Sequence, residues 1–171
     1  MNKKKYFSKI YDQFVDKIYR FIFLRVNSEE IAKDLTSETF AKVWHAFQNS
    51  EIKNLKAFLY KTARNLTTDF YREKAKISHA SLENLPPIAD PKRNPQEKVI
   101  FEEKMEKIRK SLNNLREDYR QVIILRYIDG LSIKEISEIM ERSPGAVRVL
   151  IHRALESLKR ECNKKEGFSS S

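Results

Sequence analysis

Glycine and proline are distributed so unevenly that they limit the chain to helices on both sides of one linker. No glycine occurs before Gly130, and four of the five prolines lie between Pro86 and Pro95. Proline interrupts the hydrogen bonding of helices and central strands, and this stretch also lacks a 3.6-residue apolar period. We therefore expect an all-α fold of two small helical domains, residues 1–77 and 98–171, joined by a flexible proline-containing linker, residues 78–97.

Apolar residues in the first domain recur at helical spacing and predict three amphipathic helices. The first ends near Asn27, the second runs from about residue 29 to 47, and the third starts at Leu55. The second helix has more apolar positions than one packing stripe needs, so we expect some of them to face a partner. These positions are Ile31, Leu35, Phe40, Val43, Trp44 and Phe47.

The third helix has a polar face in which cations, aromatic rings and an amide alternate. The residues of this face are Lys56, Tyr60, Lys61, Arg64, Asn65, Thr68, Asp69, Tyr71 and Arg72. Cations neutralise phosphates, rings stack on unpaired bases and an amide can read a base edge, so such a face suits single-stranded nucleic acid. A solvated basic helix face is the alternative interpretation.

The second domain contains the sequence signals of a helix-turn-helix. Two helices, over residues 99–115 and 119–128, are expected before it, and Asp129-Gly130 ends the second of them. The buried residues of that helix should be Val122, Ile123, Leu125 and Tyr127. Ser132 and Glu135 then form a capping box that starts one helix, and Ser143 before Pro144 starts the next. Two helices joined by so short a turn match the geometry that places the second helix in a DNA major groove.

This last helix is expected to have one apolar and one basic face. The apolar stripe should consist of Val147, Leu150, Ile151, Ala154, Leu155 and Leu158. The outward face then carries the basic residues Arg148, His152, Arg153 and Lys159. At its start, Ser143, Gly145 and Ala146 are small enough to let the backbone approach a ligand. A packing unit with a solvated basic face is the alternative to a DNA-reading helix.

Charge and cysteine content narrow the possible partners and exclude several kinds of site. Lys and Arg outnumber Asp and Glu by 34 to 24, which favours a polyanionic partner, either nucleic acid or an anionic membrane surface. The single cysteine, Cys162, excludes an internal disulfide and has no metal-ligand neighbours. No apolar run is longer than the four residues from Phe21 to Leu24, which is far too short to span a membrane, and the N-terminal residues do not resemble a signal peptide. We expect a cytoplasmic protein with no metal, no cofactor and no direct membrane insertion.

Three motifs follow one another along the chain. They are DLTSETFAKVW at Asp34 to Trp44, LKAFLYKTARNLTTDFYR at Leu55 to Arg72, and the stretch from Leu115 to Leu158 that includes the helix-turn-helix. In this order they resemble a group 4 (extracytoplasmic-function, ECF) sigma factor of bacterial RNA polymerase, within the sigma-70 family. The resemblance implies a first domain, like sigma region 2, that binds core polymerase and opens the −10 element. It implies a second domain, like sigma region 4, that reads the −35 element.

The resemblance also implies which residues meet each partner. The surface for core polymerase falls on Asp34, Leu35, Glu38, Phe40, Val43 and Trp44. Contacts with the single-stranded −10 element fall on Lys56, Arg64, Asn65, Asp69 and Arg72, beside the loop 48–54. Contacts with the duplex −35 element fall on Ser143, Gly145, Ala146, Arg148, His152 and Arg153. An anti-sigma factor is a further implied partner.

Two rival functions explain less of the sequence. A two-domain helix-turn-helix regulator that acts without replacing sigma would leave the first motif and the face around Asn65 without a purpose. An enzyme is disfavoured, because the chain has no glycine-rich phosphate loop and its three histidines, His45, His79 and His152, lack metal-ligand spacing.

The chain departs from the family pattern at three positions of the second domain. Ser137 replaces a frequent alanine, Glu141 a frequent glycine of the turn, and Leu155 a frequent arginine. We expect Glu141 to adopt a left-handed backbone conformation at an energetic cost of about 1 kcal/mol. We also expect a thinner basic face on the last helix, which weakens the expected sequence preference at −35.

Overall fold

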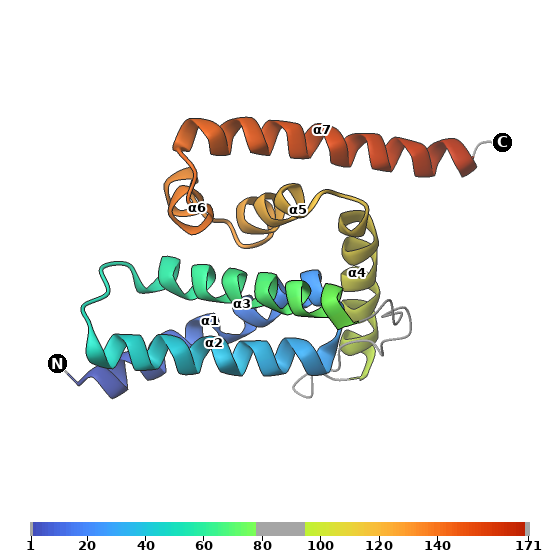
Figure 1. The fold of residues 1–171 in the computed structure, drawn as a ribbon. Helices are drawn as coiled ribbons and strands as arrows, with labels where there is room; N and C mark the ends of the chain where they lie inside the picture. The colour runs from blue at the N-terminus through green and yellow to red at the C-terminus, as the bar shows by residue number, and fades with distance from the viewer. Residues whose placement is uncertain (1, 78–94, 170–171) are drawn as a thin grey trace. The chain divides into compact units, whose positions relative to one another are not determined.

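The computed structural model describes residues 2–77 and 95–169, and these residues are almost entirely helical, with no strand among them (Figure 1). The chain divides into two compact units, Met1–Pro86 and Pro87–Ser171. The all-α prediction is therefore confirmed. Most of the expected linker, 78–94, lies outside the described residues, and a helix already begins at Pro95, within the range assigned to the linker. Proline is tolerated there because the first helical residue needs no N–H partner.

Three helices form the first unit, each antiparallel to the one before it (Figure 1). They are α1 (Lys3–Val26), α2 (Glu29–Asn49) and α3 (Leu55–Ile77). Asn27 ends α1 in a left-handed conformation with φ 56°, and the Ser28 side chain caps α2 by accepting from the Ile31 N–H at 3.3 Å. The fully buried core side chains include Ile18, Phe21, Ile22, Leu24, Val43, Leu59, Tyr60 and Ala63.

The second unit contains α4 (Pro95–Asn113), α5 (Glu117–Ile123), a π-helical turn η1 (Ile124–Ile128), α6 (Ile133–Met140) and α7 (Pro144–Ser169). Its core is formed mainly by α5, η1, α6 and the first half of α7. The most deeply buried apolar side chains are Val122, Ile124, Leu125, Leu131, Ile136, Ile139, Val147 and Ala154. Arg120 ties the end of α4 to α5, because its guanidinium donates to the carbonyls of Leu112 and Leu115 at 3.1 and 3.3 Å.

The helix predicted over residues 119–128 is continuous only as far as Ile123, and the rest is π-helical. The Asp129 N–H donates to the Ile124 carbonyl at 2.9 Å, five residues back instead of four. This wider turn changes the register of the side chains that follow. Tyr127, predicted to be buried, is instead 55% exposed, whereas Val122, Ile123 and Leu125 are buried as expected. Gly130 ends the segment with φ +69°.

The helix-turn-helix forms as the sequence predicts. Ser132 and Glu135 make both hydrogen bonds of the capping box, at 3.1 and 2.8 Å. Glu141 adopts the expected left-handed conformation, with φ 55°. Ser137 supports this turn, because its hydroxyl donates to the Arg142 carbonyl and its own carbonyl accepts from the Arg142 N–H. Ser137 and Glu141, the two departures from the family pattern in this region, therefore contribute to the same turn.

Candidate nucleic-acid and protein interfaces

The α2 residues expected to meet a protein partner do not share one surface. Asp34 and Glu38 are exposed, but Leu35 is only 8% exposed and Val43 is completely buried. Leu35 and Trp44 are nine positions apart, which at about 3.6 residues per turn places them on opposite sides of the helix. The prediction of one continuous six-residue surface is therefore wrong for three of the six residues, which are buried in the first unit: Leu35, Phe40 and Val43.

Trp44 is half-buried, so it contributes both to packing and to the surface of the first unit. One side packs on α1, with the ring centroid 4.9 Å from that of Phe7, while the rest stays accessible. Phe40 is 5% exposed and lies 4.8 Å from the ring of Tyr11. The aromatic rings of α2 are thus supported by α1. Helical spacing places Phe7 and Tyr11 on the apolar face of α1, but it does not indicate that they pack on Trp44 and Phe40.

On α3, three of the five residues expected to meet the −10 strand form one exposed stripe. Asn65, Asp69 and Arg72 are exposed and follow one another at helical spacings of four and three residues. Arg64 is half-buried at the edge of this stripe. Lys56 lies nine positions before Asn65 and so points to the opposite side of α3. The structure does not group Lys56 with the other four.

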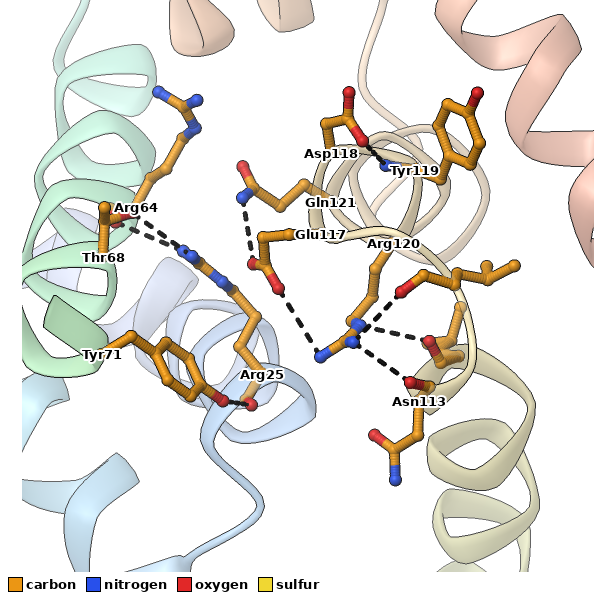
Figure 2. Close-up of polar contacts among 12 residues, drawn as sticks. Arg25, Arg64, Thr68, Tyr71, Asn113, Glu117, Asp118, Tyr119, Arg120 and Gln121 are labelled. Atoms are coloured by element: carbon orange, nitrogen blue, oxygen red, sulfur yellow. Dashed lines mark hydrogen bonds and ion pairs between the residues drawn. The ribbon is translucent and has the colours of Figure 1, made fainter. Parts of the chain in front are cut away.

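Aromatic rings contribute less to this face than the sequence suggests. Tyr60 is completely buried and packs edge-on against Phe21 at 5.6 Å. Tyr71 is half-buried, and its hydroxyl donates to the backbone carbonyl of Arg25 (Figure 2). The exposed stripe is therefore polar and charged, and base stacking by Tyr60 would require the first unit to open.

On α7, all six residues expected to meet a duplex are exposed: Ser143, Gly145, Ala146, Arg148, His152 and Arg153. Ser143 has a structural task as well, since its hydroxyl oxygen caps the helix by accepting from the Ala146 N–H at 3.1 Å. His152 lies 3.3 Å from Glu156 on the same helix. Leu155, predicted to belong to the apolar stripe, is 38% exposed. The first half of α7 thus presents small and cationic side chains to solvent.

Two family models match the chain, one in the unit that contains α3 and the other in the unit that contains α7. The sigma-70 region 2 model covers residues 10–77, and the sigma-70 region 4 model covers residues 105–158. The chain is also 30% identical to the ECF RNA polymerase sigma factor SigW of Bacillus subtilis over 164 residues, which make up 91% of this chain and 88% of SigW. The chain belongs to the ECF sigma factors of the sigma-70 family. As a sigma factor it directs promoter-specific initiation by RNA polymerase, which excludes the rival of a regulator that leaves sigma in place.

Other matches agree with this membership. The ECF RNA polymerase sigma factor BldN of Streptomyces coelicolor is 28% identical over 156 residues, and the match covers 90% of this sigma factor and 59% of BldN. The solved structure of the sigma factor RpoE, in complex with the anti-sigma factor NepR from Bartonella quintana, has a TM-score of 0.73. That likeness, at 21% identity, covers 93% of this chain and 98% of RpoE and shows the shared fold.

Further features of the sigma factor follow from the described residues. In residues 2–77 and 95–169, no helix is both long and apolar enough to cross a membrane. Helix α7 continues beyond the region 4 match, which stops at residue 158, to Ser169. Burial raises the pKa of the Tyr19 phenol well above its ordinary value, and the nearby Glu29 carboxylate raises it further.

Proposed function

We propose that this sigma factor binds core RNA polymerase through the outer surface of α2, captures the unpaired −10 strand on α3 and reads the duplex −35 element with α7. The observation that carries this proposal is the pair of exposed faces on α3 and α7, each inside the matching sigma region. Both are rich in hydrogen-bonding and cationic side chains, and both use residues that the fold does not need for its core.

For the polymerase surface, the structure favours a smaller set than the resemblance implied. Asp34, Glu38 and the accessible part of Trp44 are the groups that can touch a partner. Phe40, Val43 and Leu35 are buried and hold α2 in the unit. A half-buried tryptophan beside carboxylates has the composition of a binding hot spot with a polar rim.

For the −10 strand, the Asn65 amide is the group best suited to read a base, because it can donate and accept at one base edge. Arg72 and Arg64 flank it and can neutralise phosphates, while Asp69 can accept from an exocyclic amine. Lys56, on the other side of α3, can contact only a different part of the DNA path.

For the −35 element, the small residues Gly145 and Ala146 let the start of α7 enter the major groove, and Arg148 and Arg153 supply base or phosphate contacts. His152 lies 3.3 Å from Glu156, so the carboxylate of Glu156 offsets part of the positive potential that α7 presents to DNA.

Regulation by an anti-sigma factor is part of the proposal. The matching structure of RpoE was solved with the anti-sigma factor NepR. A protein that covered α2 of this chain would block polymerase binding. The proposed activity is non-catalytic, since the polymerase performs the chemistry, and it places the protein in the cytoplasm with the polymerase and promoter DNA.

Run-off transcription tests this function. Core polymerase with the purified protein should initiate at a subset of fragments from a promoter library, whereas core polymerase alone should not. Failure to initiate on any fragment would refute the proposal. Trp44→Ala combined with Asp34→Ala should abolish association with core polymerase, because loss of an aromatic anchor costs about 2 kcal/mol or more. Asn163→Ala, at an exposed position of α7 in the other unit, is the control, and circular dichroism checks that the double variant stays folded.

A further inference from the structure

Arg25, in the last turn of α1, is a long cationic side chain buried almost completely, with 1% of its surface exposed. Its guanidinium reaches across to α3 (Figure 2). One terminal nitrogen donates to the Arg64 backbone carbonyl at 3.2 Å, and the other donates to the Thr68 hydroxyl at 3.3 Å. Burying a cation is unfavourable unless it is well hydrogen-bonded, so these contacts are needed to keep Arg25 inside.

The contact between the two helices is reciprocal. While the Arg25 side chain donates to α3, the Arg25 backbone carbonyl accepts from the Tyr71 hydroxyl of α3 (Figure 2). The Thr68 hydroxyl also donates to the Arg64 carbonyl, at 2.9 Å. The bonded positions on α3, from Arg64 to Tyr71, extend over about 10 Å of helix at 1.5 Å per residue. We call Arg25, Thr68 and Tyr71, with these bonds, the α1–α3 clamp.

The clamp lies directly beside the proposed −10 face. Arg64, whose carbonyl the clamp holds, precedes Asn65, and Thr68 precedes Asp69. Consecutive residues on a helix are about 100° apart, so the clamp occupies the flank next to the exposed stripe and not the buried side opposite it. Any rotation or sliding of α3 would therefore stretch clamp hydrogen bonds and move Asn65 at the same time.

Stability alone does not explain a buried guanidinium at this place. Well-packed apolar residues often replace buried charged groups with no loss of stability, whereas directional hydrogen bonds define one relative placement of two helices. We propose that the α1–α3 clamp sets the position of α3 so that Asn65 meets the unpaired −10 base in one geometry. Arg25, Thr68 and Tyr71 are then positioning residues for promoter opening. This inference rests on the −10 role proposed for α3.

Thr68→Val and Tyr71→Phe are the appropriate variants, because each removes a hydroxyl and keeps the shape of the side chain. Thr67→Val is the matched control: Thr67 is the adjacent residue, is completely buried, and its hydroxyl bonds only within α3, to the Ala63 carbonyl at 2.7 Å. Thr68→Ser keeps the hydroxyl and should behave as the unmodified protein does. All variants are assayed as full chains bound to core polymerase.

The readout is base discrimination on templates whose −10 region is held open as a mismatched bubble. Initiation is compared between templates that differ in one base of the bubble, well below the unfolding temperature of each variant. We expect Thr68→Val and Tyr71→Phe each to lower this discrimination about 10-fold, because each variant removes one hydrogen bond of the clamp. Thr67→Val and Thr68→Ser should leave it unchanged.

Two results would overturn the inference in distinguishable ways. If Thr68→Val and Tyr71→Phe discriminate as Thr67→Val does while Asn65→Ala fails to discriminate, α3 reads the base but the clamp does not position it. If Asn65→Ala itself discriminates normally, the proposed role of α3 is wrong and the clamp inference falls with it. Equal loss in Thr68→Val and Thr67→Val would show that only the stability of α3 matters, which also rejects the clamp.

Discussion

The two proposed DNA-binding helices are held in the protein in different ways. Helix α3 lies against both other helices of its unit, and the side chain and backbone carbonyl of a buried arginine link it to α1 over about two helical turns. Its proposed DNA face is a narrow stripe with a half-buried arginine at one edge. Helix α7 presents its first half with all six expected contact residues exposed, and it is oriented by the short turn and caps that precede it.

This difference matches the two kinds of DNA that the helices are proposed to bind. A duplex already has a defined groove, so a helix needs only the right entry angle and accessible side chains. An unpaired base is mobile, and selecting it requires donors and acceptors that are already fixed in place. Tight anchoring of α3 and open presentation of α7 are therefore separate physical solutions, and variants in the two helices should fail at different steps.

The largest effect is expected at Asn65. Asn65→Ala should leave duplex promoter binding intact and abolish strand opening, a loss of about 100-fold at the upper range of a base contact. Permanganate reactivity of melted thymines measures opening, and gel shift measures binding. Asn163→Ala, at an exposed asparagine of α7 beyond the region 4 match, is the control. Loss of duplex binding by Asn65→Ala would erase the distinction between the two helices.

Substitutions on α7 should act earlier and more weakly. Arg148→Ala or Arg153→Ala should weaken closed-complex binding by about 1 to 3 kcal/mol if the side chain contacts a base, with relaxed preference at one −35 position. If it contacts a phosphate, affinity should fall uniformly and the salt dependence should flatten. Arg160→Ala, on the same helix beyond the match, should change neither. An effect confined to strand opening would contradict the assignment of α7 to duplex reading.

The turn that orients α7 gives a smaller, stabilising prediction. Glu141 has φ 55°, a conformation that favours glycine, so Glu141→Gly should raise the free energy of unfolding of the second unit by up to about 1 kcal/mol. Thermal unfolding of the full chain measures it. Asn27→Gly, at the left-handed residue of the first unit, should raise the free energy of unfolding by less, because asparagine tolerates this conformation. A destabilised Glu141→Gly would mean that the Glu141 side chain supports the turn.

The smallest effect concerns the stability of the first unit at high pH. Burial raises the pKa of Tyr19 in the folded state, so its stabilising contribution is present below about pH 10, the ordinary tyrosine value, and is lost as the pH rises above it. Tyr19→Phe should therefore lose less stability than the unmodified protein between about pH 9 and pH 12. Tyr127→Phe, whose ring is 55% exposed, serves as the control. Identical pH profiles for the Tyr19 variant and the unmodified protein would refute this.

Much of the candidate site could be predicted because its signals are local. The capping box at Ser132, the N-cap at Ser143 and the left-handed Glu141 depend on hydrogen bonds and backbone conformations within a few residues. They determine the helix-turn-helix, and the exposed half of α7 follows from helical periodicity. The stripe of Asn65, Asp69 and Arg72 follows from the same periodicity on α3.

Predictions failed where a side chain's environment depends on distant elements. The polar ends of Tyr60 and Tyr71 suggested a DNA face. The Tyr60 ring instead packs on Phe21, and the Tyr71 hydroxyl donates to the Arg25 backbone carbonyl. Leu35 and Lys56 belong to their motifs, yet helical rotation places Leu35 opposite Trp44 and Lys56 opposite Asn65. Tyr127 is exposed and lies in the π-helical turn, where the Asp129 N–H bonds five residues back to the Ile124 carbonyl. Apolar spacing does not reveal such a turn.

The sequence by itself determined the helices, their caps, the turn between α6 and α7 and membership in the sigma family, because short-range hydrogen bonds and apolar periodicity define these features. Only the tertiary structure decided that Arg25 is buried, that it holds α3 through partners 39 and 43 residues away, and which part of α2 can reach another protein. The reason is physical: whether a polar side chain faces solvent or satisfies a distant backbone carbonyl depends on how whole helices pack, and no local pattern encodes that packing.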